Sequence, residues 1–448
     1  MKSSFLWWLV WLAPAVAGVF AARSLIHYFQ LSSYQVGGYA HTLRRQIKVA
    51  WLPGLLTAVL CFGITYAADA VAYLAPVPIL LLACVLMVLS GLGVGLAFCA
   101  KRKQRKPLHI TGRVIRLSIS LGVVLLLLAW GLHFVLPVVG GSALLLPLLP
   151  VWLVLAAWLV WPVEKTINNM FLRDAIRILN AQTGLVRIGI TGSYGKTSVK
   201  FILRTILNEK YPVLATRFSF NTPMGITRSI REDLRPEHRI FIAEMGARHP
   251  KDIKELCNFV KPEIGILTAV GEVHLQTFRT IERVRETKYD LIRSLPRDGL
   301  AVFYDDGGIC RELYERTDRQ KVLVGSIGSN AWAEDVELHN DGSTFTLCLR
   351  HGDRARCETL LPGEHNIRNI LLAAATAYEL GLNIGQIQRG IAAVQPVESR
   401  IKPEKLADGR VIINNGFNAN PDSSKESLAL LAAYPGRRIV VTPGYVEM

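Results

Sequence analysis

The chain has 448 residues, 51% of them hydrophobic, with 51 Lys or Arg against 35 Asp or Glu and a formal net charge of +16. This length exceeds one ordinary domain, and the charge is divided unevenly. Residues 1–162 hold twelve basic residues and one acid, Asp69, a balance of +11, whereas the remainder holds 39 basic and 34 acidic residues, a balance of +5. The excess charge flanks apolar segments and forms no basic patch interleaved with aromatic residues, so we predict no nucleic-acid partner. The seven scattered cysteines include no C-x-x-C pair and predict reduced, mostly buried thiols.

Five apolar stretches are each long enough to cross about 30 Å of hydrocarbon. The first follows Lys2 as a signal peptide would, but its three tryptophans and the missing small-x-small exit favour a membrane anchor. We therefore predict an α-helical transmembrane bundle of about five spans over residues 1–163. The five stretches are residues 5–22, 49–67, 77–100, 114–136 and 142–161.

The positions of Lys and Arg predict the orientation of these spans. Connections 23–48 and 101–113 hold ten of the twelve N-terminal basic residues, so both are expected in the cytoplasm. Everything after residue 161 then lies in the cytoplasm, and we predict a multi-pass protein of the inner membrane. Membrane lipids are expected partners, and the basic run 101–106 is a candidate contact for anionic headgroups. Residues 28–39 are either an interfacial segment or an ordinary loop.

The run TGSYGKTS at residues 191–198 predicts a phosphate-binding loop between an apolar strand, 186–190, and a helix, 199–207. Its two glycines let the backbone amides turn inward, Lys196 can reach the β- and γ-phosphates of a nucleotide, and the Thr197 hydroxyl can bind Mg²⁺. The run fits the short T-G-x-x-G-K-[ST] form; a plain glycine-rich turn with a surface lysine is the alternative. The predicted nucleotide-binding residues here are Thr191, Gly192, Ser193, Gly195, Lys196, Thr197 and Ser198.

Strands and helices alternate after a helix at residues 167–180. This alternation predicts an α/β, doubly wound, mostly parallel sheet over residues 164–396, with ligands at the carboxyl ends of its strands. Helices are expected at 250–260 and 281–295, and a small antiparallel hairpin at 334–358. The strands predicted after the first are residues 213–216, 240–244, 264–268, 301–304 and 321–324.

A second α/β unit of the Rossmann type is predicted to begin after Pro396, over residues 397–448. Its expected elements are strands at 411–414 and 439–442 and a helix at 424–433. Two strands and one helix cannot bury a self-sufficient core, so this segment either packs on the preceding domain or belongs to a longer protein.

Other polar residues stand near the predicted strand ends. Glu244 ends its strand, where a carboxylate can ligate Mg²⁺ beside Thr197 or simply cap a helix. Taken alone, His274 is an ordinary loop histidine and Lys288 a solvated helix lysine. The amides Asn366 and Asn369, three residues apart at a helix start, suit either a flat hydrogen-bonding ligand or helix capping.

In this order, these motifs resemble the Mur ligases, and most closely the branch that adds D-alanyl-D-alanine. The resemblance covers roughly residues 180–448. The apolar half has no counterpart in the ordinary soluble ligase, which begins with a domain that grips the UDP-linked muramyl substrate. The matching features are the phosphate loop, 219–226 (SFNTPMGI), Glu244, 271–275 (GEVHL), Lys288, 365–369 (HNIRN), Arg400 and 417–423 (FNANPDS).

This resemblance implies ATP-dependent amide synthesis for the cell wall. A substrate carboxylate is phosphorylated to an acyl phosphate, an amino acid or dipeptide amine attacks it, and ADP and phosphate leave. ATP and two Mg²⁺ ions are implied, with Lys288 carbamylated. The implied catalytic residues are Lys196, Glu244, His274 and Lys288, and the implied metal ligands are Thr197, Glu244, His274 and Lys288. Asn366 and Asn369 match positions near the adenine, and Arg400 matches one at a hinge.

The chain departs from the family before its N-A-N-P run. Where the family has paired aspartates, one of them reaching the nucleotide, this chain has Asn414 and Asn415. Asn415 can accept a hydrogen bond from a ribose hydroxyl but offers no charge-assisted binding, so weaker nucleotide affinity or lost activity is predicted.

Three hypotheses follow. The leading one is a membrane-anchored ADP-forming amide ligase that acts on a carboxylate-bearing cell-wall precursor. Its alternatives are the same chemistry on a lipid-linked substrate, and a non-catalytic membrane scaffold that binds nucleotide. A transporter driven by an ATPase domain is disfavoured because the spans lack paired buried charges.

Overall fold

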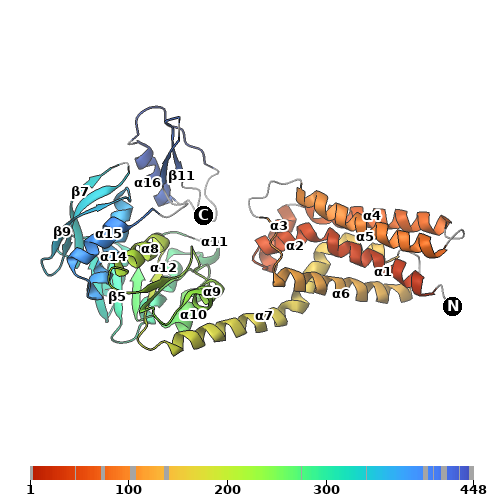
Figure 1. Cartoon of the computed structure of the whole chain (residues 1–448), viewed down its shortest axis with the longest axis horizontal. Helices are drawn as coiled ribbons and strands as arrows, with labels where there is room; N and C mark the ends of the chain where they lie inside the picture. The colour runs from red at the N-terminus through yellow and green to blue at the C-terminus, as the bar shows by residue number, and fades with distance from the viewer. Residues whose placement is uncertain are drawn as a thin grey trace. The chain divides into compact units, whose positions relative to one another are not determined.

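The structure is a computed structural model that divides into two compact units, Met1–Asn169 and Met170–Met448 (Figure 1). The helix α7 (Leu149–Ala181) runs through the division between them. The structure describes residues 4–45, 47–71, 76–100, 107–135, 141–273, 275–339, 341–396, 402–406, 408–414, 421–432 and 434–442.

The first unit is helical. Among its described residues, four helices are long and apolar enough to cross a membrane, or five when the bent pair Leu12–Ala21 and Arg23–Leu31 counts as one span. The predicted number of spans therefore agrees with helix length and composition. The elements are α1 (Ser4–Ala21), α2 (Arg23–Leu31), α3 (Val36–Arg45), α4 (Ile47–Val71), α5 (Pro76–Ala100), α6 (Gly112–Val135), the 3₁₀ helix η1 (Gly141–Leu148) and α7 (Leu149–Ala181).

Helices α1 and α5 pack by close approach of their backbones. A Cβ atom at Gly91 would lie 2.2 Å from the carbonyl oxygen of Ala17, and one at Gly95 would lie 2.2 Å from that of Phe20. The two glycines are four residues apart and therefore face the same side of α5. Small residues at this spacing let two apolar helices approach where hydrophobicity alone selects no partner.

Residues 28–39 form the end of α2, a turn and the start of α3, rather than an ordinary loop. The buried rings of Phe29 and Tyr39 meet edge to face with centroids 5.0 Å apart. The guanidinium of Arg113 lies 4.0 Å from the ring centroid of Tyr34 and joins this aromatic group to α6.

Helix α7 corrects one prediction. The expected span 142–161 and the expected helix 167–180 were separate elements, but one helix of 33 residues contains most of the first and all of the second. Pro162 lies inside it without ending it, because a proline removes a single backbone donor and an apolar helix tolerates that loss. After Met170 the helix belongs to the second unit, where Ala175 and Leu179 are buried.

The second unit is built on a nine-stranded mixed sheet in the order β2-β3-β1-β4-β5-β6-β7-β8-β9. Strands β1 to β6 are parallel, and the predicted strands occur within two residues of the expected bounds. The strands are β1 (Val186–Thr191), β2 (Val213–Ala215), β3 (Ile240–Glu244), β4 (Ile264–Leu267), β5 (Leu300–Tyr304), β6 (Gln320–Val324), β7 (Ala331–Leu338), β8 (Ser343–Leu349) and β9 (Arg354–Thr359).

The polar stretch 334–358 is larger than predicted. It lies within three antiparallel strands, β7 to β9, instead of a separate hairpin, and Ala331 pairs with Val324 to join them to the parallel sheet. The sequence did not show this because the joining contact is a single register pair.

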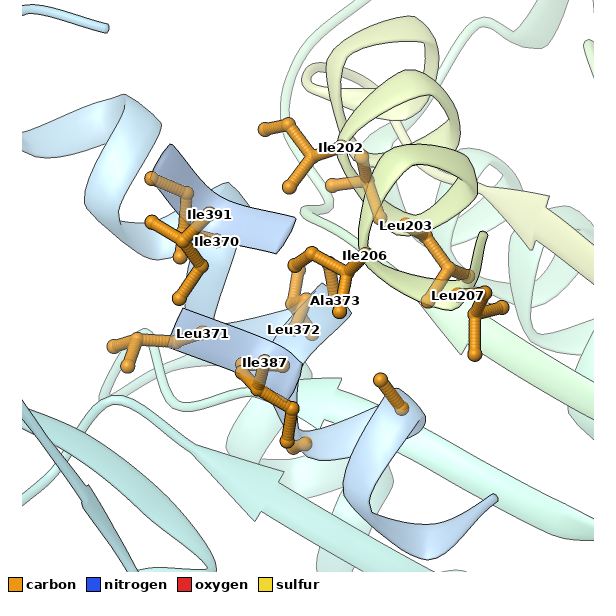
Figure 2. Packing of buried hydrophobic residues seen from close by; sticks show 14 of the residues in the cluster. Ile202, Leu203, Ile206, Leu207, Ile370, Leu371, Leu372, Ala373, Ile387 and Ile391 are labelled. Atoms are coloured by element: carbon orange, nitrogen blue, oxygen red, sulfur yellow. The ribbon is translucent and has the colours of Figure 1, made fainter. Parts of the chain in front are cut away.

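Helices cover both faces of this sheet. One face packs against α8 and the pair α14 and α15, and the other against α10, α12 and the end of α7. Figure 2 shows Ile202 and Ile206 of α8 beside Ile370 of α14 and Ile387 of α15. A Cβ atom at Gly390 would lie 2.6 Å from Cα of Ile206, so α15 fits closely on α8. The helices are α8 (Lys196–Leu207), α9 (Pro223–Asp233), α10 (Asp252–Val260), α11 (Leu275–Phe278), α12 (Ile281–Arg293), α13 (Ile309–Glu315), α14 (Glu364–Glu379) and α15 (Ile384–Ala393).

The C-terminal elements are β10 (Lys402–Lys405), β11 (Val411–Asn414) and α16 (Pro421–Ala432). Strand β11 has the predicted bounds, but it pairs antiparallel with β10. The strand predicted at 439–442 is wrong, because residues 437–442 have no regular secondary structure. A β-branched run becomes a strand only beside a pairing partner, and Val441 is exposed instead. A Rossmann-type second domain stays a prediction.

Candidate active site

The site lies where the strand order reverses. Strand β1 sits between β3 and β4; from it the chain passes to β2 and β3 on one side and to β4, β5 and β6 on the other. Ligands of open α/β sheets collect at the carboxyl edge of such a switch point. The phosphate loop, Glu244 and Thr268 follow or end these three neighbouring strands and therefore meet at this edge.

Two glycines give the phosphate loop its shape. Gly195, with φ of +78°, occupies the N-cap position of α8 in the left-handed region, which side chains disfavour. A Cβ atom there would also lie 2.6 Å from Oδ1 of Asn369. At Gly192 a Cβ atom would lie 2.0 Å from Oγ1 of Thr268. The loop therefore tolerates glycine alone at both positions and touches α14 and the segment after β4.

A strap of residues 268–272 holds the loop from one side. The Ser193 amide donates to the Ala269 carbonyl at 2.7 Å, and the Ser193 hydroxyl bonds both the amide and the carbonyl of Gly271 at 2.8 Å. The Tyr194 hydroxyl donates to the Glu272 carbonyl at 3.0 Å, and Thr268 donates to the Tyr194 carbonyl. The roles of Tyr194 and Thr268 were missed, because no local pattern joins segments 74 to 78 residues apart.

Lys196 begins α8 and folds back over the loop. Its ammonium donates to the carbonyls of Gly192, at 2.6 Å, and Ser193, at 3.2 Å. The charge is thus held above the loop that would carry a phosphate, within reach of an incoming anion.

Thr197 and Glu244 lie together, as their predicted shared role requires. The Thr197 hydroxyl donates to Oε1 of Glu244 at 3.1 Å, and the Asn221 amide donates to the same oxygen at 3.2 Å. The other carboxylate oxygen accepts from the ammonium of Lys200 at 3.0 Å. Glu244 and Lys200 are both essentially inaccessible to solvent.

This donor set fits Mg²⁺. A hydroxyl and a carboxylate are hard oxygen ligands, and Mg²⁺ usually takes only one or two protein ligands and completes its shell with water and phosphate oxygens. Among the described residues no group of three or more His, Cys, Asp or Glu side chains is placed to hold a metal. Thr197 and Glu244 would therefore hold the ion jointly with a nucleotide.

Lys288 on α12 is buried, so the solvated lysine of the simple interpretation is wrong. Burial lowers the pKa of Lys288 well below its usual value, and the positive charge of Lys196 lowers it further. The nearby thiol of Cys310 has its pKa raised, chiefly by burial. A lowered pKa favours the neutral amine, which is the form of lysine that can react with carbon dioxide.

The start of α14 abuts the phosphate loop through Asn369. Asn366 donates to the Pro362 carbonyl at 2.8 Å, as a residue that fixes the helix start would. Burial lowers the pKa of His365 to about 4, and the charge of Arg368 acts in the same direction, so this imidazole is neutral at neutral pH.

Three predicted site residues, His274, Arg400 and Asn415, lie outside the described residues. Asn414 is the last residue of β11. The structure brings together the phosphate loop, Thr197, Glu244 and Asn369, and it adds Lys200 and Asn221, which the sequence did not single out as site residues. Asn221 stands in the run 219–226 that carries the family resemblance, so its signal was present.

The site defines a nucleotide-binding α/β domain of the phosphate-loop class. At the switch point it combines a strand, a loop shaped by glycines and a helix with a lysine, a hydroxyl and a carboxylate. Residues 190–377 match the family model of the Mur ligase middle domain. This part of the chain is therefore a domain of the Mur ligase middle type, and the predicted resemblance to the Mur ligases is confirmed.

Relatives by sequence include UDP-N-acetylmuramoyl-tripeptide–D-alanyl-D-alanine ligases of several bacteria. The chain is 29% identical over 266 residues to UDP-N-acetylmuramoyl-tripeptide–D-alanyl-D-alanine ligase of Escherichia coli strain K12, covering 58% of each chain. It is 34% identical over 251 residues to the same ligase of Mycobacterium tuberculosis strain H37Rv, covering 56% of this chain and 49% of that one. The chain thus spans about half the length of the curated relatives it matches.

Solved structures of MurF ligases also resemble this chain. MurF from Acinetobacter baumannii matches with a TM-score of 0.57 and 26% identity, over 60% of this chain and 59% of that one. MurF ligase from Thermotoga maritima in complex with ADP matches with a TM-score of 0.55 and 26% identity, over 60% and 62%.

Proposed function

We propose that this chain is an ATP-dependent amide ligase of the Mur type that joins an amino acid or dipeptide to a carboxylate of a cell-wall precursor. The names of its relatives suggest that the dipeptide is D-alanyl-D-alanine. The observation that carries the proposal is the 3.1 Å contact of Thr197 with Glu244 beside a preformed phosphate loop. The family match and the names of the relatives support the reaction class.

The reaction has two steps. A substrate carboxylate oxygen attacks the γ-phosphorus of ATP, and the bond to ADP breaks to give an acyl phosphate. The amine nitrogen of the second substrate then attacks the acyl carbon, the bond to phosphate breaks, and the nitrogen loses a proton. Both steps need charge neutralisation and orientation more than covalent catalysis.

The residues of the site divide this work. The loop amides and the N-terminus of α8 receive the phosphates, while Lys196 exchanges its two backbone carbonyl partners for phosphate oxygens. Mg²⁺, when held by Thr197 and Glu244, supplies further positive charge at the transferred group. We further propose that a carbamylated Lys288 and His274 hold a second ion, and that Asn366, Asn369, Arg400 and Asn415 contact or enclose the nucleotide.

The long apolar helices of the first unit support membrane anchoring. We propose an inner-membrane protein whose ligase domain faces the cytoplasm, where ATP is available. The same helices favour a second candidate, in which the acceptor carboxylate is carried by a lipid-linked precursor.

The test uses full-length protein in detergent, supplied with ATP, Mg²⁺, a UDP-muramyl tripeptide and D-alanyl-D-alanine. We expect ADP, phosphate and the mass of the ligated product, with Thr197→Ala as the inactive control. Product formed only from a lipid-linked carboxylate would select the second candidate. If the protein binds nucleotide but releases no phosphate from ATP with any of these substrates, both candidates are contradicted and the non-catalytic scaffold is favoured.

A further inference from the structure

We propose that Lys200 is a positioning residue of the nucleotide site. It holds the Glu244 carboxylate with one oxygen turned toward Thr197, and it fixes the 216–221 loop at the same edge of the sheet. The role of Lys200 in a nucleotide site rests on the proposed function, but the contacts of Lys200 described below do not depend on it.

Lys200 lies one helical turn after Lys196, and its side chain points into the protein rather than toward the phosphates. None of its surface is exposed, and its ammonium lies 3.0 Å from Oε2 of Glu244, whose side chain is 1% exposed. The ammonium also lies 4.5 Å from the ring centroid of Phe201. An ion pair with both members removed from water needs well-directed partners, so its geometry is strongly constrained.

The two oxygens of Glu244 therefore have different tasks. Oε2 is taken by Lys200, and Oε1 faces the hydroxyl of Thr197 and the amide of Asn221. A carboxylate held this way offers a single oxygen to a cation at Thr197. Lys200 thus makes Glu244 a one-oxygen ligand of fixed direction.

The second partner of Lys200 is the backbone carbonyl of Phe218. Phe218 has φ of +42°, in the left-handed region that residues with a side chain adopt uncommonly. Its ring is mostly exposed and meets the ring of Phe220, in the same loop, edge to face with centroids 5.9 Å apart. The buried ammonium supplies the fixed point, and the same loop carries Asn221 to Glu244.

The experiment compares Lys200→Met and Lys200→Gln with Lys210→Met in the full-length protein in detergent. Lys210 also donates to a backbone carbonyl, that of Gly381 at 2.6 Å, but it has no contact with Glu244. The probes are Mn²⁺ in the presence of a non-hydrolysable ATP analogue, the same analogue with EDTA, and hydrogen exchange of the 216–221 amides without metal or nucleotide.

For Lys200→Met we expect Mn²⁺ affinity to fall at least tenfold, analogue binding in EDTA to stay within twofold, and exchange of the loop amides to accelerate at least tenfold. Lys200→Gln, which keeps one donor, should lie between this variant and the parent. Lys210→Met should match the parent in all three measurements.

The sign of the Mn²⁺ effect separates the explanations. Removing a positive charge next to a carboxylate strengthens cation binding when charge alone matters, so unchanged or tighter Mn²⁺ binding overturns the proposal. An equal loss of analogue binding in EDTA also overturns it, because a general folding defect would then be the cause. If Lys200→Met does not fold, Lys200→Gln carries the comparison. The exchange measurement needs no ligand and tests Lys200 even if the ligase function fails.

Discussion

Each unit of the molecule buries a carboxylate, and the two differ in what surrounds them. Glu164, on α7 of the first unit, accepts from Arg116 at 2.6 Å and lies 3.6 Å from Arg113, and both arginines keep about a third of their surface in solvent. Glu244 of the second unit meets Lys200, which has no exposed surface. The first arrangement ties two helices together and leaves its two cations partly in solvent, whereas the second removes both charges from water and stands at a strand end. From this contrast we propose that Glu244 is a functional residue and Glu164 a structural one.

The largest expected effect comes from Glu244→Gln, which keeps the shape but removes the charge. We expect phosphate release in the ligation assay to fall by about 10²–10³-fold, the size typical for losing a group that stabilises transferred charge. The contrast weakens if Glu164→Gln, assayed in parallel, reduces the rate comparably.

Gly91→Leu tests whether the stability of the first unit depends on the close approach of α1 and α5, in contrast to the buried charges of the second unit. A side chain there must displace the Ala17 backbone of α1, so we expect a loss of at least about 1–3 kcal/mol of stability. Thermal unfolding in detergent measures it. Gly93→Leu is the matched control on α5, because a Cβ atom at Gly93 meets nothing within 4 Å; equal losses would refute the close-packing explanation.

Lys288→Met is expected to raise stability while it lowers activity. Because the folded pKa of Lys288 is lowered, the unfolded chain binds a proton that the folded chain does not, and stability rises with pH up to the unfolded pKa of about 10.4. Methionine removes this cost, so we expect a gain of about 1–4 kcal/mol at pH 7 that fades toward pH 10.

Chemical denaturation across pH in buffer free of carbon dioxide is the measurement for Lys288→Met. A gain independent of pH, or none, would show that the lysine carries no such cost in the folded protein. The ligation assay in bicarbonate should show the loss of activity.

The smallest expected effect is that of Glu164→Gln on stability. Breaking a fully buried pair costs about 3–5 kcal/mol, but the exposure of Arg113 and Arg116 reduces this to about 1–2 kcal/mol. Thermal unfolding measures it, and no change in the ligation rate is expected. A rate defect larger than the loss of stability would reassign Glu164 to the functional class.

The sequence predicted those elements whose structure is determined by consecutive residues. The apolar strands β1 and β3 and the glycine-lysine loop between strand and helix are written in consecutive residues, and their bounds followed from them. Lys200 was missed because its meaning depends on β3 and on the 216–221 loop packing over α8, neither of which is adjacent in sequence. Lys288 was interpreted as solvated for the same reason, because the sequence of α12 alone does not show that the fold buries this side chain.

The wrong predictions share a different cause. Residues 439–442 have the composition of a strand, but a strand exists only when a neighbour pairs with it. The prediction of a span ending at residue 161 and a helix beginning at residue 167 left a break between them, where one helix continues. In both places the local sequence does not determine the outcome, which depends on contacts with other parts of the fold.

The strap at residues 268–272 has a kinetic consequence. Ser193 and Tyr194 are hydrogen-bonded to the strap within the protein itself, so the strap orders the loop when the chain folds. The conformational entropy of that ordering is lost once, during folding, rather than at every binding event. If the site binds ATP as proposed, we expect the association rate to reflect encounter with the site rather than rearrangement of the loop.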